Sequence, residues 1–111
     1  MRPRYEVTQM NQLLLFLLNQ LENGVPWTRT NEIAIQTSTK KYVSQTRTLV
    51  IRRAEFFGHL KVKRETHNKR YVALTKRGIE HLAYLGLISE ERAEKAKKLL
   101  ESFSALYGEG P

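Results

Sequence analysis

The sequence of 111 residues contains neither cysteine nor aspartate. Without cysteine the chain can form no disulfide, no cysteine-ligated zinc site and no thiol nucleophile, which fits a reducing compartment. The lack of aspartate disfavours a metal-dependent nuclease, which needs clustered carboxylates to hold its ions. Glycine-rich phosphate loops, serine nucleophile motifs and paired carboxylates in an apolar setting are also missing. We therefore expect neither an enzyme nor a cofactor.

Long apolar runs are equally scarce. The run Leu13–Leu18 is far too short to cross a bilayer, and the polar start MRPRYEVTQMNQ is not followed by a cleavage site. His59 and His81 stand without a second ligand at metal-binding spacing, so no metal is expected. These observations predict a soluble cytoplasmic protein with no membrane partner. Hydrophobic residues still make up 41% of the chain, which is enough for the core of one domain.

Positive charge is what the sequence has in excess. The formal net charge is +8 and the isoelectric point about 10.0. Between Lys40 and Arg77 there are twelve basic residues against two acidic ones, a net charge of +10, whereas the rest of the chain carries seven basic and nine acidic residues, a net charge of −2. An ordinary solvated face is the usual meaning of such a run. Concentrated on one stretch, it also indicates an anionic partner such as nucleic acid.

Hydrophobic periodicity and turn residues predict an α+β fold. The helices each end at a glycine or begin at a hydroxyl-bearing cap, and the strands alternate apolar and polar residues. In chain order, the expected elements are a helix from Thr8 to Leu21, an extended segment over 25–29, a short helix over 31–38 capped by Thr30, a helix from Lys41 to Phe57, a hairpin with strands 59–65 and 70–74, a helix over 76–86 capped by Thr75, and a helix over 90–108 capped by Ser89.

Two segments carry a family resemblance. They are NEIAIQTSTKKYVSQTRTLVIRRAEFFG and HLKVKRETHNKRYVALTKRG, within roughly Thr28 to Leu85. Together they resemble the winged helix-turn-helix DNA-binding superfamily, and YVALTKRG looks much like the last wing strand and following helix cap of MarR-like and PadR-like regulators. Arg47 falls about where those families often have an apolar residue. The resemblance implies a winged-helix domain over 1–88 and an additional C-terminal dimerisation helix over 89–111.

The resemblance also implies a DNA-binding surface on the Lys41–Phe57 helix and the hairpin. The helix would enter the major groove and the hairpin, as the wing, would contact phosphates. Tyr42 would either contact DNA or pack under the hairpin, and His67 has the ordinary role of a solvated turn residue as its alternative. The expected DNA-binding residues are Thr39, Lys40, Lys41, Tyr42, Ser44, Gln45, Thr48, Arg52, Lys63, Arg64, His67, Asn68, Lys69 and Arg70.

An apolar stripe on the C-terminal helix predicts a homodimer. Its residues recur at spacings of three and four, which is a heptad-type seam. The seam must be buried against the first helix, either of the same chain or of a second subunit, and we favour the second subunit. The expected interface residues are Leu15, Phe16, Ala93, Ala96, Leu99, Leu100, Phe103, Leu106 and Tyr107.

The function expected from these features is sequence-specific binding of double-stranded DNA by a dimeric transcriptional regulator associated with the nucleoid. An architectural or partition protein that coats DNA would use the same surface. A winged-helix module that binds an acidic protein is the alternative from another class. The sequence identifies neither the operator nor a small-molecule effector.

Overall fold

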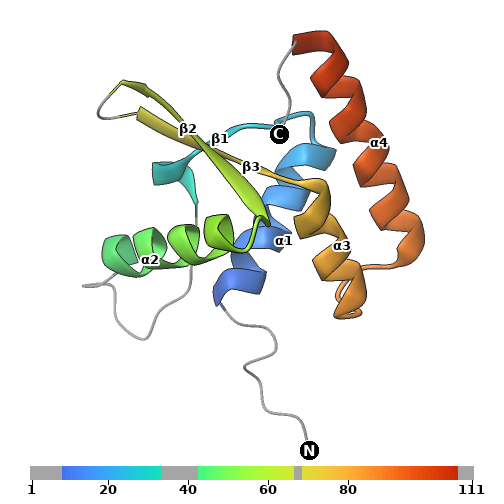
Figure 1. The fold of residues 1–111 in the computed structure, drawn as a ribbon, viewed down its shortest axis with the longest axis horizontal. Coiled ribbons are helices and arrows are strands. Elements are labelled where there is room, and N and C mark those ends of the chain that lie inside the picture. The colour runs from blue at the N-terminus through green and yellow to red at the C-terminus, as the bar shows by residue number, and fades with distance from the viewer. Residues whose placement is uncertain (1–8, 34–42, 67–68, 108–111) are drawn as a thin grey trace, which may run out of the picture.

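The computed structural model describes residues 9–33, 43–66 and 69–107. It confirms an α+β fold with a small antiparallel sheet (Figure 1). The elements are, in chain order, α1 (Gln9–Glu22), β1 (Thr28–Arg29), the 3-10 helix η2 (Thr30–Glu32), α2 (Val43–Phe56), β2 (Leu60–Thr66), β3 (Lys69–Leu74), α3 (Lys76–Tyr84) and α4 (Glu90–Tyr107). Among the described helices, none is both long and apolar enough to cross a membrane.

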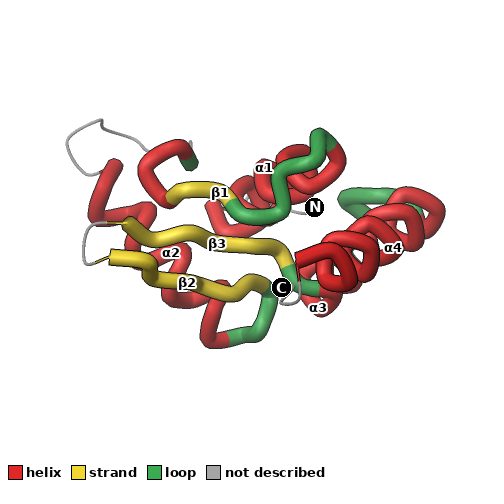
Figure 2. The backbone as a smooth tube through the Cα atoms, turned by 90° about the horizontal axis from the view of Figure 1, so that it is seen from above, coloured by secondary structure: helices red, strands yellow, loops and turns green. Residues whose placement is uncertain are grey.

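The short sheet places β3 between β1 and β2, with both pairings antiparallel (Figure 2). In the hairpin, Leu60 lies opposite Leu74 and Val62 lies opposite Val72. Side chains alternate between the two faces of a strand, so these four residues share one face. Leu60, Leu74 and Val72 are buried, and Val62 packs against the same core. The hairpin therefore has an apolar base directed toward the helices.

Helix α1 is the centre of the core. Leu13, Leu14, Leu17, Leu18 and Leu21 are each at most 2% exposed. The helix contacts α2, α3, α4 and β3, which explains why its sequence is apolar nearly all round. Each fully buried leucine contributes about 2 kcal/mol of transfer free energy, so α1 is the largest single source of stability in this small domain.

Leu15 and Phe16, expected at a subunit interface, are only partly buried in the structure and pack against the same core. The chain itself thus covers part of both side chains.

Helix α4 buries its seam against its own chain. Ala93, Ala96 and Leu100 are at most 3% exposed, and α4 contacts both α1 and α3. Arg92 anchors the helix, since its guanidinium donates to both carboxylate oxygens of Glu22, over 2.8 and 2.9 Å. The alternative in which the seam packs on the first helix of the same chain therefore accounts for these three residues, and they are unavailable to a second subunit while the core is intact.

The rest of the expected interface on α4 is less deeply placed. Leu99 and Phe103 are partly buried and pack against the core. The last turn of α4 contains Leu106 and Tyr107, whose side chains lie outside the part of the chain that the structure describes. The homodimer stays a prediction.

Two predicted helix caps are confirmed. The Thr75 hydroxyl accepts a hydrogen bond from the Gly78 amide (3.1 Å) and donates one to the Gly58 carbonyl (2.6 Å). The Ser89 hydroxyl accepts from the Arg92 amide (3.1 Å). Gly58, predicted as the left-handed residue that ends the preceding helix, has a φ of +79°. Thr75 thus joins the start of α3 to the end of α2 at the base of the hairpin.

The segment after β1 differs from its prediction. In place of an α-helix starting at residue 31, Thr30–Glu32 form a single 3-10 turn, and the backbone is extended again at Ile33. The remainder of the predicted helix, residues 34–38, lies outside the described residues. Arg47 from α2 donates to the Ile33 carbonyl (3.3 Å), so its guanidinium satisfies a backbone acceptor just after this turn.

Candidate nucleic-acid interface

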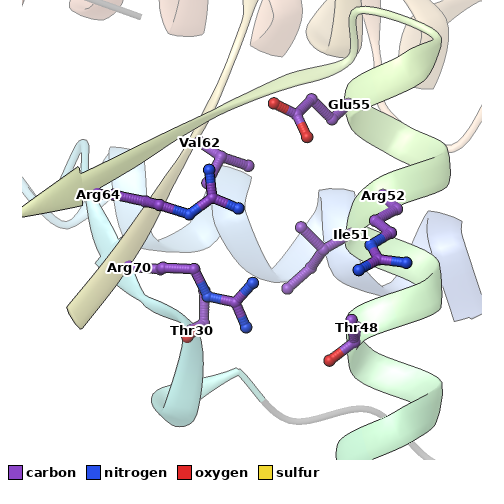
Figure 3. Close-up of a pocket in the computed structure, with 8 residues that line it drawn as sticks. All are labelled: Thr30, Thr48, Ile51, Arg52, Glu55, Val62, Arg64 and Arg70. Carbon is purple, nitrogen blue, oxygen red and sulfur yellow. The ribbon is translucent and has the colours of Figure 1, made fainter. Parts of the chain in front are cut away.

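A groove separates α2 from the β2–β3 hairpin and is lined mainly by polar side chains (Figure 3). Its cavity volume is about 70 Å³, more than the roughly 10–15 Å³ that one water molecule needs on the same measure. Helix α2 contacts β2 directly, and Ile51 and Val62 contribute apolar side chains to the lining of the groove. Among the described residues, the lining consists of Thr30, Thr48, Ile51, Arg52, Glu55, Val62, Arg64 and Arg70.

The register of the hairpin explains why two arginines enter this groove. Leu60, Val62 and Arg64 alternate along β2 and therefore share a face. Arg70 lies directly opposite Arg64 on β3, so it shares that face too. Both guanidinium groups extend from the strands toward α2 (Figure 3). The two arginines thus continue the core-facing rows of the hairpin, at the point where the apolar core ends.

A register shift follows immediately after this arginine pair. Arg64 pairs with Arg70, but the next pairing joins Thr66 to Lys69, so Glu65 has no cross-strand partner. An irregularity of this kind bends a strand and changes the direction of the side chains beside it. The hairpin therefore changes its pairing where its charged end begins.

The arginines of the groove are not neutralised within the described chain. None of Arg52, Arg64 and Arg70 has an ion pair or side-chain hydrogen bond to another described residue. Like charges directly opposite each other on neighbouring strands destabilise a sheet. Of the described residues that line the groove, Glu55 is the one carboxylate, which leaves this part of the lining with a formal charge of +2. The arrangement can hold an anion.

Lys63 lies on the opposite face of the hairpin from the groove. Its ammonium nitrogen is 4.6 Å from the centre of the Trp27 ring and 6.0 Å from that of Tyr71. Such cation–π contacts hold the lysine against the sheet. We expected Lys63 and Arg64 to contact the same partner as one basic wing, but the structure divides them between two faces, and Lys63 has aromatic partners within its own chain.

The outer face of α2 differs from the predicted one. Thr48, expected to face outward, is half-buried and lines the groove, whereas Arg52 is exposed as expected. The exposed positions also include Leu49 (63%), Arg53 and Phe56 (85%), none of which was predicted as part of the surface. Leu49 and Phe56 are seven residues apart and therefore lie on one line along the helix. The sequence prediction for this helix placed neither Leu49 nor Phe56 on its DNA-binding face.

The inner face of α2 packs against the core. Ile51 and Ala54 are buried, and Val50 packs against the core. Phe57 is 47% exposed. It follows the last residue of α2, where the chain turns through Gly58, so helical periodicity no longer fixes its direction.

Of the remaining predicted DNA-binding residues, Lys69 has a described side chain and the others do not. Lys69 is exposed at the far end of the hairpin, next to Arg70. Ser44 and Gln45 belong to the first turn of α2, but their side chains lie outside the described part. The residues that lie wholly outside it are Thr39, Lys40, Lys41, Tyr42, His67 and Asn68. The structure therefore brings together four predicted residues, Thr48, Arg52, Arg64 and Arg70.

A pair of histidines lies at the base of the hairpin. The rings of His59 and His81 stack with centroids 4.2 Å apart, and Phe57 stacks on His59 in turn. Burial lowers the pKa of His59, and the nearby His81 and Arg77 lower it further. Burial also lowers the pKa of His81. The His59 Nδ1 atom is buried without a hydrogen-bond partner. Within the described ranges, no group of three metal-ligating side chains includes these histidines.

No protein-family profile, curated protein or solved structure matches this chain. Its function must therefore be inferred from the charge and geometry of its own residues.

Proposed function

We propose that the protein binds double-stranded DNA as a winged helix-turn-helix protein, with α2 in the major groove and the hairpin on the sugar-phosphate backbone. A helix with its side chains is about 10–12 Å across, which suits a major groove about 12 Å wide. The β2–β3 hairpin follows α2 and contacts it, so one duplex can meet both elements. The α+β fold with its three-stranded sheet is compatible with this architecture.

The observation that carries the proposal is the unequal neutralisation of charge. Among the described residues, the carboxylates in ion pairs lie on α1, α3 and α4, where they meet Lys76, Arg92 and Lys97. The arginines of α2 and the groove have no such partners. A basic surface left without internal counter-charges is the electrostatic footprint of a nucleic-acid binder.

The first test is the salt dependence of binding to a random-sequence duplex, followed by fluorescence anisotropy. If each subunit neutralises about 4–6 phosphates, log K should fall with log [salt] with a slope of roughly −4 to −5. Changing Lys69 and Arg70 together to alanine should flatten the slope and weaken binding to all sequences alike.

The matched control is the double change of Lys95 and Lys98 to alanine. It removes the same charge from the exposed surface of α4 and should leave the slope unchanged. A slope that is the same in the wing variant as in the wild type would remove the hairpin from the contact surface. No affinity for duplex DNA at low salt would refute the proposal itself.

We propose further that the protein is a dimeric, sequence-specific regulator. Two copies would place two α2 helices about 34 Å apart, one turn of the duplex. Selection from random duplexes, together with sedimentation of the purified protein, tests this step. A palindromic site with half-sites one turn apart and a dimer mass support it, whereas a spreading footprint without a preferred sequence identifies a protein that coats DNA.

A second candidate function, binding of an acidic protein, is favoured by the exposed stripe on α2. Leu49 and Phe56 lie beside Arg52 and Arg53, and protein interfaces are enriched in aromatic residues and arginine. The protein would have this function instead if it fails to bind duplex DNA at low salt but binds an acidic protein, and if changing Phe56 to alanine abolishes that binding.

A further inference from the structure

We propose that the groove between α2 and the hairpin is a clamp for one phosphate group, held by Arg52, Arg64 and Arg70. The inference rests on the proposed DNA binding for its ligand, a phosphodiester of the backbone. The same chemistry would also bind a free phosphate, so the test below separates the two sources.

The three guanidinium groups come from three different elements. Arg52 is on α2, Arg64 on β2 and Arg70 on β3, and all three line one cavity of about 70 Å³. A cavity of this volume has room for a small polar group. A phosphate that projects from a larger molecule can enter from the open side of the groove.

The pairing of Arg64 with Arg70 is a second observation that supports an anion in the groove. Inward positions of a hairpin usually carry apolar side chains, as Val62 and Val72 do one step earlier. At the next inward pair, Arg64 and Arg70 face each other, and their like charges oppose the pairing of β2 with β3. An anion between the two guanidiniums turns this repulsion into two attractions. The arrangement is therefore more stable with a ligand than without one.

The number of donors favours phosphate over a carboxylate. One arginine fork satisfies both oxygens of a carboxylate, so a site for an acidic side chain needs only one. A tetrahedral phosphate presents more oxygens in different directions, and guanidiniums that approach from three elements match it. Thr30 and Thr48 line the same cavity beside them. The formal charge of +2 remains after Glu55 is included and suits an anion of one or two charges.

The first experiment removes the bidentate hydrogen-bonding geometry of two guanidiniums and keeps their positive charge. Changing Arg64 and Arg70 together to lysine retains both positive charges and loses bidentate geometry. We expect affinity for a random-sequence duplex to fall about tenfold, as two charge-assisted hydrogen bonds are weakened. The control is again the double alanine change of Lys95 and Lys98 on α4, which should bind like the wild type.

A mutant cycle separates a shared clamp from independent contacts. If Arg52 holds the same phosphate, its change to lysine should cost much less in the Arg64/Arg70 double variant than in the wild type. Additive losses would show that Arg52 contacts a different group and would overturn the three-arginine clamp. Wild-type affinity in the lysine double variant would overturn the proposal as a whole, because charge alone would then explain binding.

The second experiment needs no DNA. Inorganic phosphate is titrated into the full chain while the arginine Nε–H signals are followed by NMR. Saturable shifts of the Arg64 and Arg70 signals with one common affinity, absent from Arg53, show a phosphate site. If this site is present but no duplex binds, the proposed DNA function fails and the clamp serves a free phosphate ligand. If the lysine variant loses duplex affinity without any response to free phosphate, the clamp is specific to the DNA backbone. No response in either experiment overturns the inference.

Discussion

Replacing Gly78 by alanine should have two opposing effects on stability. It raises the helix propensity of α3, and it worsens the packing at the base of the hairpin. Gly78 lies in the first turn of α3, where alanine would favour the helix by about 1 kcal/mol. A Cβ atom there would lie 2.3 Å from the His59 carbonyl oxygen and 2.7 Å from Leu74 Cδ1. The carbonyl belongs to the backbone and cannot rotate away. The start of α3 must therefore move from the hairpin by about 1 Å or more, since ordinary carbon contacts begin near 3.5 Å.

The cost of this movement exceeds the gain in propensity. Overpacking a well-packed site costs about 1–3 kcal/mol, and the movement also strains the hydrogen bond from the Thr75 amide to the His59 carbonyl (3.1 Å), which is worth about 1 kcal/mol. After subtracting the propensity gain, we expect Gly78→Ala to lower the free energy of unfolding by about 1–3 kcal/mol. For a domain of this size the midpoint of thermal unfolding should fall by roughly 10 °C.

Thermal and urea unfolding followed by circular dichroism measure this change. Gly86→Ala is the matched control, because Gly86 has a φ of +76° but a Cβ atom added there would have nothing within 4 Å. It should lose only the cost of a left-handed alanine, about 1 kcal/mol. A Gly78→Ala protein as stable as the wild type, or more stable, would refute the packing at this junction.

The core, the histidine pair and the exposed side of α2 each support a further prediction. Leu100→Glu places a charge in the core of its own chain, so circular dichroism should show unfolding; a folded monomer would instead assign Leu100 to a subunit interface. Folding stability should be greatest above about pH 6.5 and fall as the pH drops toward the lowered pKa values of His59 and His81. The reason is that, in this pH range, the unfolded chain binds protons that the folded chain excludes. The slope of stability against pH should be at most about 1.4 kcal/mol per pH unit for each histidine. His59→Phe keeps a stacked ring and should reduce this slope in urea titrations at several pH values; an unchanged slope would exclude His59 as its source. If Leu49 contacts a thymine methyl in the major groove, replacing thymine by uracil in a selected duplex should cost the wild type about 0.8 kcal/mol and the Leu49→Ala protein almost nothing, whereas equal losses would place Leu49 elsewhere.

The parts of the fold that depend on neighbouring residues could be predicted from the sequence. Gly58 ends α2, and Thr75 and Ser89 begin α3 and α4, because each cap depends on a few residues of one turn. The hairpin could be predicted for the same reason, since Leu60 and Val62 alternate with lysines. The α+β fold follows from these local signals.

Features that depend on distant partners could not be predicted in the same way. A stripe such as Ala93, Ala96 and Leu100 has the same spacing whether it packs on its own chain or on another, so periodicity could not decide between them. The position of the groove arginines, in contrast, follows from local alternation along the strand. Extending the alternation of Leu60 and Val62 by one step places Arg64 on the inner face, but its charge suggested an outward position.

The base of the hairpin determines how its far end can move. Strand β2 leaves the body of the protein beside Gly58, and β3 returns to it at Thr75, whose hydroxyl bonds to the Gly58 carbonyl and whose amide bonds to the His59 carbonyl. This junction fixes both strands at one end, while α2 contacts β2 and β1 pairs with β3 further along. Seven residues of β2 span about 23 Å at 3.3 Å per residue. A rotation of about 10° at the fixed end would displace the far end by about 4 Å, which is enough to make or break a contact with a phosphate. The stiffness of the Thr75 junction, together with the support from β1 and α2, thus limits how far the basic end of the hairpin can move.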